Sequence, residues 1–323
     1  MTAPGPPPPF DPECAAVLAG LPPFPTLAVE SLASIRQPPP QFMPPTEEQL
    51  AASGAFRVER RIVPGPAGVP DLALTICRPA TLPSSRPAIY RVHGGGMIMG
   101  NARTALPRYL DWAEELDVVV VAVHYRLAPE TPHPGPVEDC LAGYSWLVEN
   151  ADQIGVDPRR IVLAGESAGA GLAAALALLL RDRGGQSPAG ELLMAPMLDD
   201  RNDSPSVLQM AGVDVWDRAR NEFGWTALLG NARGGPDVSP YASPARATDL
   251  SGLPPTFLDV GSAETFRSEV VDYASRIWLA GGHAELHVWP GGFHGYDGVA
   301  PDAAISRQAG AARLVWLRRL LAD

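Results

Sequence analysis

From residue 56 onward, short apolar runs alternate with longer stretches in which apolar residues recur every three or four positions. One short run, residues 117–124, is apolar and β-branched almost throughout, which is typical of a parallel strand buried on both faces. The expected strands are residues 56–62, 72–78, 88–92, 117–124, 161–164, 191–195, 256–260 and 284–289. The expected helices are residues 102–116, 137–150, 168–183, 266–280 and 303–321. This alternation predicts an α/β fold with a mostly parallel central sheet flanked by helices.

Two stretches interrupt the alternation. Residues 1–50 are rich in proline, which ends helices, so we expect short helices or extended segments that lie over the main body. Residues 199–249 are irregular, although Trp216, Phe223 and Trp225 stand at helical spacing. We interpret this second stretch as an insertion that packs on the same body.

Length and composition limit the class of protein. The chain has 323 residues, 46% of them hydrophobic, so it can form one large α/β unit with an appendage or two domains. A net charge of −11 and the lack of a basic cluster argue against nucleic acid or an anionic membrane as a partner. The longest apolar stretch, residues 168–180, is too short to span a bilayer. Residues 1–10 lack a secretory signal, so we expect a cytoplasmic protein without stable membrane insertion.

The three cysteines, Cys14, Cys77 and Cys140, are far apart and odd in number. Their spacing fits neither a disulfide framework nor a metal site. His283 and His287 stand four positions apart in the sequence HAELH, and the two-residue period of an expected strand places both on one face, but no third ligand accompanies them. We expect a solvated strand face there, and neither a metal nor an organic cofactor in the protein.

The strongest local signal is the sequence GESAG, from Gly165 to Gly169, between an expected strand and an expected helix. In such an elbow the serine, here Ser167, has a strained backbone at a sharp turn that exposes its hydroxyl above the sheet. Gly165 and Gly169 are needed because the chain passes too close to itself for a Cβ atom. Ser167 is therefore the candidate nucleophile, and a turn serine that only caps the helix is the alternative.

A second signal, HGGG, follows the expected strand 88–92 and comprises His93, Gly94, Gly95 and Gly96. Clustered glycines let backbone N–H groups point at a substrate oxygen, as an oxyanion hole requires. We interpret His93 as a residue that anchors the loop and not as a proton carrier. The alternative is a glycine-rich loop that merely turns.

A serine hydroxyl needs a base and an orienting carboxylate before it can act as a nucleophile. His294 stands in a glycine-rich loop just after the expected strand 284–289, where catalytic groups collect in open α/β sheets. It is the candidate base, and a hydrogen-bonded loop histidine is the alternative. Glu264 follows the expected strand 256–260 and is the candidate acid, whereas Asp259, within that strand, is the alternative acid.

These residues together resemble the hormone-sensitive-lipase-like branch of the serine α/β-hydrolases, also called bacterial esterase family IV. HGGG and GESAG match the paired signatures of that branch, and the YRLAPE sequence at residues 125–130 matches the segment after its fourth strand. Residues 156–161, 239–240 and 253–255 are also similar to segments of the branch. The resemblance covers roughly residues 55–323.

The resemblance implies an α/β-hydrolase fold with a helical cap over the active site. The implied division is an N-terminal cap segment (1–50), a first part of the core (51–198), a cap insertion (199–249) and a second part of the core (250–323). It also implies that Ser167 is the nucleophile and His294 the base, with the backbone N–H groups of Gly94, Gly95 and Ala168 as oxyanion donors.

The sequence departs from the branch at four positions. Glu264 stands where Asp is usual, and Ala170 where a third glycine is common. Tyr296 stands where Phe is frequent, and His124 where an Asp commonly precedes the YRLAPE tyrosine.

The expected function is a serine carboxylesterase that hydrolyses short- to medium-chain esters through an acyl-enzyme intermediate. Lactones, amides or carbamates are alternative substrates for the same triad. A receptor without catalysis, similar to the plant gibberellin receptors, is disfavoured because those lose the histidine that His294 supplies here. A dinucleotide-binding enzyme is disfavoured because its motif, residues 169–174, falls inside an expected helix. The expected partner is a small-molecule ester, and strand 284–289 could pair two copies into a homodimer.

Overall fold

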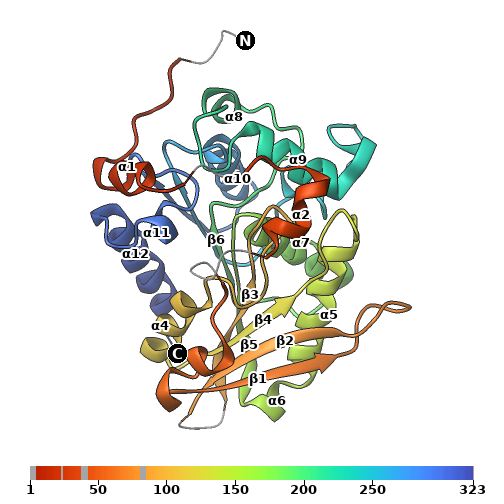
Figure 1. Ribbon diagram of the computed structural model, residues 1–323. Helices are drawn as coiled ribbons and strands as arrows, with labels where there is room; N and C mark the ends of the chain where they lie inside the picture. The colour runs from red at the N-terminus through yellow and green to blue at the C-terminus, as the bar shows by residue number, and fades with distance from the viewer. Residues whose placement is uncertain (1–4, 23–24, 38–42, 81–84, 323) are drawn as a thin grey trace.

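The computed structural model describes residues 5–22, 25–37, 43–80 and 85–322. An eight-stranded sheet with the order β1-β2-β4-β3-β5-β6-β7-β8 forms its centre (Figure 1). β2 is antiparallel to β1 and β4, and all the other neighbouring strands are parallel. The strands are β1 (Phe56–Val63), β2 (Leu72–Pro79), β3 (Arg86–Val92), β4 (Val119–His124), β5 (Val156–Glu166), β6 (Gly190–Met194), β7 (Thr256–Gly261) and β8 (Ala284–Trp289).

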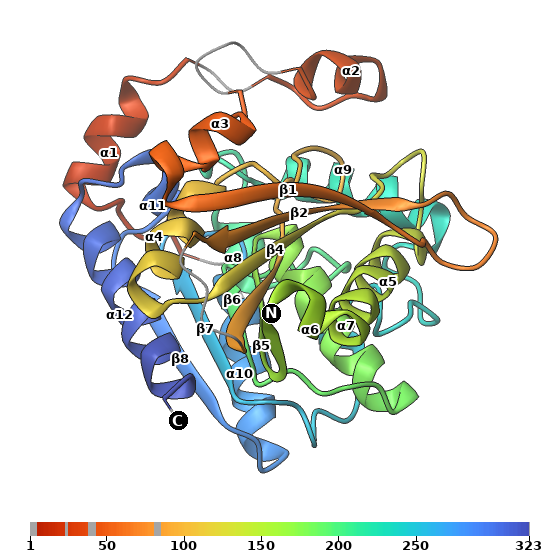
Figure 2. The same ribbon diagram turned by 90° about the horizontal axis from the view of Figure 1, so that it is seen from below.

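Helices cover both faces of the sheet, as Figure 2 shows, which confirms the predicted α/β class. One face carries α5 (Gly135–Glu149), α7 (Ala168–Arg183) and α10 (Arg267–Leu279), and the other carries α4 (Leu106–Leu116) and α12 (Ala304–Leu320). Val121 of β4 belongs to the core under α5 and α7, whereas Val120 belongs to the core under α4 and α12. Because successive side chains of a strand point to opposite faces, residues 117–124 need apolar side chains on both.

Three helices from the two irregular stretches lie around one end of the sheet (Figure 1). In Figure 1, α2 (Leu32–Ile35), α8 (Pro205–Gln209) and α9 (Arg218–Leu229) lie at the upper end of the molecule. Ile35 of α2 and Arg220 of α9 line the same cavity, so both irregular stretches of sequence reach it. The remaining short helices are α1 (Pro12–Ala19), α3 (Glu47–Leu50), α6 (Ala151–Ile154) and α11 (Tyr296–Val299).

The expected four-part division stays a prediction. Residues 1–4, 23–24 and 38–42 of the expected N-terminal cap segment lie outside the described residues. Across the part of the chain that is described, no helix is long and apolar enough to cross a membrane.

The helix expected from residue 102 starts later than its apolar spacing indicates. α4 begins at Leu106, and two turns precede it, in which Thr104 N–H donates to the Asn101 carbonyl and Leu106 N–H to the Arg103 carbonyl. Ala105 has a left-handed φ of 56°, which interrupts any helix that runs through it. Pro107 then suits the first turn because it has no N–H to leave unpaired.

A buried glutamate lies near the start of β6, at the end of the strand away from the cavity. Glu191 is fully buried, and its Oε2 accepts a hydrogen bond from Thr256 Oγ1 at 3.1 Å. Its Oε1 has no hydrogen-bond partner within the described structure. Burial raises the pKa of Glu191 to about 8, so the folded protein holds this carboxyl in its neutral form at neutral pH.

We predict that Glu191→Gln stabilises the protein increasingly as pH rises. The folded-state pKa lies above the unfolded value, so the wild type loses stability between roughly pH 4.5 and pH 8, and the amide does not. Near pH 8 the free energy of unfolding of the variant should exceed that of the wild type by about 2–4 kcal/mol. Thermal unfolding across this pH range measures the effect, with the exposed Glu114→Gln as a control for loss of charge. A difference independent of pH would contradict the prediction.

Candidate active site

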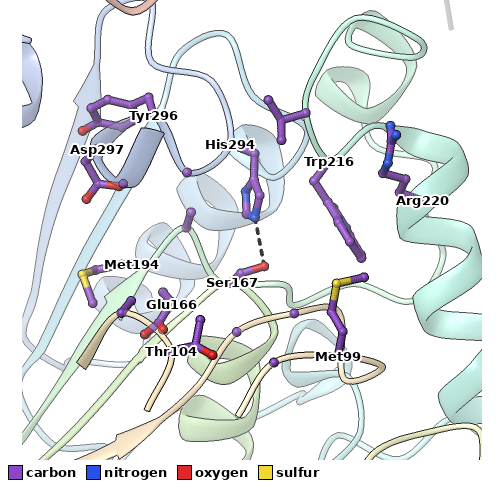
Figure 3. Close-up of a pocket in the computed structure, with 18 of the residues that line it drawn as sticks. Met99, Thr104, Glu166, Ser167, Met194, Trp216, Arg220, His294, Tyr296 and Asp297 are labelled. Carbon is purple, nitrogen blue, oxygen red and sulfur yellow. Dashed lines mark hydrogen bonds between the residues drawn. The ribbon is translucent and has the colours of Figure 1, made fainter. Parts of the chain in front are cut away.

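The chain turns sharply at Ser167, between β5 and α7. Ser167 has φ 56° and ψ −124°, a conformation that residues other than glycine rarely adopt. Its N–H donates to the Met194 carbonyl at 2.8 Å, and its carbonyl accepts the Met197 N–H at 3.1 Å, which hold the strained turn. A Cβ atom on Gly169 would lie 2.2 Å from the Val92 carbonyl oxygen, so this position requires glycine. The turn directs the hydroxyl toward His294 (Figure 3).

Three side chains from separate stretches of sequence meet at this turn. His294 Nε2 lies 2.9 Å from Ser167 Oγ, and His294 Nδ1 lies 2.7 Å from Glu264 Oε1. Glu264 is fully buried, and its Oε2 accepts the Gly261 N–H at 2.9 Å. The ring of Phe266 meets the imidazole edge to face, with centroids 5.1 Å apart. The imidazole is thus oriented to take the hydroxyl proton on one side while the carboxylate fixes its tautomer on the other.

Carboxylates around His294 favour its protonated form. Burial lowers the pKa of His294, but the charge and hydrogen bond of Glu264 and the charges of Asp214 and Asp297 together outweigh it. The pKa of His294 is therefore raised above its ordinary value. The same carboxylates would stabilise an imidazolium formed during a reaction.

Asp259, the alternative acid, has different partners. Its Oδ2 accepts hydrogen bonds from Arg313 Nε at 2.8 Å and from Trp289 Nε1 at 3.0 Å. Arg313 also pairs with Asp297, so Asp259 belongs to a buried ion network. Among the described contacts, no hydrogen bond joins Asp259 to His294. The geometry therefore favours Glu264 as the acid.

The glycine cluster after β3 packs against the serine turn. A Cβ atom on Gly94 would lie 2.8 Å from the Glu166 carbonyl oxygen, and Gly95 has a left-handed φ of 114°. In the described part of the chain, the N–H groups of Gly94 and Gly95 donate to no protein acceptor. Ala168 is the first residue of α7, so its N–H has no acceptor within the helix. Gly94 and Gly95 line the cavity beside Ser167, where an oxyanion would need donors, and Ala168 directly follows Ser167.

His93 holds this loop in place. Its ring stacks on Tyr125 with centroids 4.1 Å apart, and its Nδ1 lies 2.9 Å from the Gly94 carbonyl oxygen. Tyr125 in turn donates its hydroxyl to the His93 carbonyl at 2.8 Å. Burial lowers the pKa of His93 to about 3, so the ring is neutral at physiological pH. A neutral imidazole with these contacts is suited to holding the glycine loop in place and not to carrying a proton.

Comparison with known proteins places the chain in a family. Residues 89–297 match the alpha/beta hydrolase fold family. The chain is 33% identical over 289 residues to carboxylesterase NlhH of Mycobacterium tuberculosis, an alignment that covers 88% of this chain and 86% of that protein. The chain belongs to the α/β-hydrolase family.

Two further similarities define the branch of the family. A solved bacterial heroin esterase superposes with a TM-score of 0.87 and 36% identity, over 97% of this chain and 98% of that chain. Hormone-sensitive lipase of Mus musculus is 36% identical over 120 residues, which are 37% of this chain and 16% of that protein. The predicted resemblance is confirmed, and this α/β-hydrolase is a hormone-sensitive-lipase-like esterase.

Two other histidines of this hydrolase, His287 and His124, have structural partners. His287 stacks between Phe257 and Trp289, with ring centroids 5.0 Å and 5.3 Å away. Its Nε2 lies 3.0 Å from Glu285 Oε1, and within the described residues no cluster of ligands could hold a metal ion. His124 Nε2 lies 2.8 Å from Thr75 Oγ1, a contact between β4 and β2.

The cavity above Ser167 has a volume of about 560 Å³. Figure 3 shows Trp216, Met99 and Arg220 on one side of Ser167 and Met194 and Tyr296 on the other. Of the three aromatic residues that stand at helical spacing in residues 199–249, Trp216 lines the cavity, and the fully buried Trp225 packs in the core.

Sequence reasoning missed one residue of the site. Asp214 lies in the irregular stretch between α8 and α9, and its Oδ1 accepts the backbone N–H of His294 at 2.9 Å. No motif marks this aspartate, because its contacts with the site are to residues that follow it by 51 and 80 positions. Only the folded chain brings them together.

We predict that Glu264→Gln and Asp259→Asn affect different properties of this esterase. Glu264→Gln removes the charge that fixes and stabilises His294, so kcat should fall about a thousandfold to ten-thousandfold. Asp259→Asn breaks a buried ion pair instead and should cost roughly 3 kcal/mol of stability, with kcat within about tenfold of the wild type. Steady-state kinetics and thermal unfolding of both variants decide between the acids. If Asp259→Asn instead lost a thousandfold or more in kcat while Glu264→Gln kept kcat and lost stability, Asp259 would be the triad acid.

Proposed function

We propose that the chain is a serine carboxylesterase that hydrolyses short- to medium-chain carboxylic esters through an acyl-enzyme intermediate. The observation that carries this proposal is the hydrogen-bonded row of Glu264, His294 and Ser167 at the floor of the cavity. Such a row can activate a serine hydroxyl, which is a weak nucleophile on its own. Membership of the esterase branch supports the ester bond as the target.

The first half of the proposed reaction forms the acyl-enzyme. Ser167 Oγ attacks the ester carbonyl carbon while its proton passes to His294 Nε2, which already lies within hydrogen-bond distance. The carbonyl oxygen becomes an oxyanion that accepts hydrogen bonds from the N–H groups of Gly94, Gly95 and Ala168. The tetrahedral intermediate then expels the alcohol, which leaves with the proton from His294.

The second half releases the acid. His294 takes a proton from a water molecule, whose oxygen attacks the acyl carbon under the same amide donors. Collapse of this second intermediate breaks the bond to Ser167 Oγ, which regains its proton from His294. The balance is one ester and one water consumed, and one carboxylic acid and one alcohol released. Every proton transfer uses His294, so the scheme requires no cofactor.

The shape of the cavity supports small substrates. A volume of about 560 Å³ would hold an ester of short to medium chain length, and the walls combine Leu27, Ile35 and Trp216 with polar groups near Ser167. A receptor without catalysis would not need an imidazole 2.9 Å from the serine hydroxyl. The cytoplasmic location and a homodimer through β8 stay predictions.

We predict that Ser167→Ala abolishes ester hydrolysis. Without the hydroxyl no acyl-enzyme can form, and kcat should fall by about a millionfold if the three side chains act as a unit. Hydrolysis of p-nitrophenyl esters of increasing chain length measures the loss and gives the chain-length preference of the wild type. An organophosphonate probe should label the wild type and leave Ser167→Ala unlabelled. Near-normal hydrolysis by the variant would refute the proposal.

We predict that kcat/KM rises with pH through a midpoint above the ordinary histidine value of about 6.5. The reaction needs His294 neutral, and because its pKa is raised, the protonated and inactive form persists to a higher pH. Titration of the released acid from an ethyl ester measures the profile without a titrating leaving group. A midpoint clearly below the ordinary value would contradict the assignment of His294 as the base.

A further inference from the structure

Asp214 connects the two loops that carry the acid and the base. Its Oδ1 accepts the N–H groups of His294 at 2.9 Å and of Val215 at 2.7 Å. Its Oδ2 accepts the N–H of Thr265 at 2.9 Å and lies 3.2 Å from the Thr265 hydroxyl oxygen. Thr265 directly follows Glu264, so one carboxylate, only 6% exposed, is bonded to the base itself and to the neighbour of the acid.

Trp216, two positions after Asp214, packs against the glycine loop of residues 93–96, called the oxyanion loop below. The Trp216 carbonyl accepts the Thr265 hydroxyl at 2.7 Å. The Trp216 ring covers Gly96 so closely that a Cβ atom there would lie 2.3 Å from the indole. Figure 3 shows this ring beside His294, and the two ring centroids lie 6.4 Å apart. The segment Asp214–Trp216 therefore contacts the acid loop, the base loop and the oxyanion loop at once.

The charge of Asp214 is unusual among the buried aspartates of this chain. A buried carboxylate is costly unless it is paired or strongly hydrogen-bonded, and Asp200 and Asp259 pair with Arg246 and Arg313. Among the described contacts, no arginine pairs with Asp214. The cation that it would face is the protonated ring of His294, which Glu264 faces as well.

We propose that Asp214 is a positioning residue for ester hydrolysis, which holds the His294 and Glu264 loops together and places a second negative charge behind the imidazole. This inference rests on the proposed function. Asp214 touches neither substrate nor the reacting atoms, and it acts through the backbone of His294 and Thr265 and through its charge. The part of the chain that covers the cavity thereby also maintains the catalytic geometry below it.

The charge of Asp214 should shift the pKa of His294 in a definite direction. The charged groups that face His294 are Glu264, Asp214 and Asp297, and those that face Asp214 are Glu264 and His294 itself. Burial, followed by repulsion from Glu264, raises the pKa of Asp214 to about 6. The negative form of Asp214 raises the pKa of His294, so its removal should lower that pKa and move the acid limb of kcat/KM to lower pH.

The test compares Asp214→Asn with Asp200→Asn. Asp200 is a matched control because it is also buried in residues 199–249 and accepts a backbone N–H, from Gly234 at 2.7 Å, but does not contact His294 or Glu264. We expect Asp214→Asn to lower kcat about 10- to 100-fold with KM within about threefold, because small displacements of catalytic groups slow the chemical step. The acid limb should move to lower pH in this variant alone, even if both variants unfold at lower temperature.

A second pair of variants keeps the test decisive if Asp214→Asn does not fold. Thr265→Val removes the hydroxyl that donates to the Trp216 carbonyl beside Asp214 Oδ2, and Thr265→Ser retains it. Thr265→Val should lower kcat at least threefold relative to Thr265→Ser, without a matching change in KM. Equal kcat values for this pair would overturn the inference.

The results separate the inference from the function on which it rests. If the wild type hydrolyses esters through Ser167 but folded Asp214→Asn keeps its kcat and acid limb, only the role of Asp214 is refuted. An equal shift of the acid limb in Asp200→Asn would also refute it, because a general loosening of the fold would then explain the effect. If the wild type hydrolyses no ester and Ser167 takes no phosphonate probe, the proposed function itself fails.

Discussion

The site depends on two hydrogen bonds to one imidazole ring. The sheet makes them possible, because β7 and β8 are neighbours and the loops after them carry Glu264 and His294. Ser167 follows β5, two strands away from β7, and its N–H is bonded to the end of β6 between them. Parallel strands place their carboxyl ends at one edge, so loops distant in sequence converge there. The strained backbone of Ser167 persists because the surrounding packing leaves it no alternative.

Much of this arrangement could be predicted from the sequence, because it depends on local chemistry. The alternation of buried strands and amphipathic helices specifies the α/β sheet, and the GESAG and HGGG sequences mark turns that need glycine. The residue at which α4 starts, in contrast, could not be predicted from the sequence. Apolar spacing continues through Ala105, whose left-handed backbone ends the turn before the helix begins.

The choice between Glu264 and Asp259 shows where sequence reasoning stops. The two carboxyls are five positions apart at the end of one strand, and either could reach a histidine in a neighbouring loop. What separates them is Arg313, on α12, which pairs with Asp259 and leaves Glu264 to face His294. Asp214 is a stronger case, because nothing near it in the sequence indicates chemistry and its role follows only from the loops that it joins.

The two segments over the cavity contact the core in different ways. From the N-terminal stretch, Arg36 donates to the Ile98 and Ala128 carbonyls and to Glu130, which secures α2. The same stretch also reaches the His294 loop, where the Asp11 N–H donates to the Gly291 carbonyl at 2.9 Å and Phe10 packs edge to face on Phe293. Residues 199–249 supply Asp214, which accepts the His294 amide itself, and Trp216, whose carbonyl accepts the hydroxyl of Thr265, the neighbour of Glu264. Changes at Arg36, which lines the cavity, should therefore alter which esters fit, whereas changes near Asp214 should also alter the rate of the chemical step. A variant that exchanges residues 199–249 for new specificity would then retain its catalysis only if a buried acceptor for the His294 and Thr265 amides is kept.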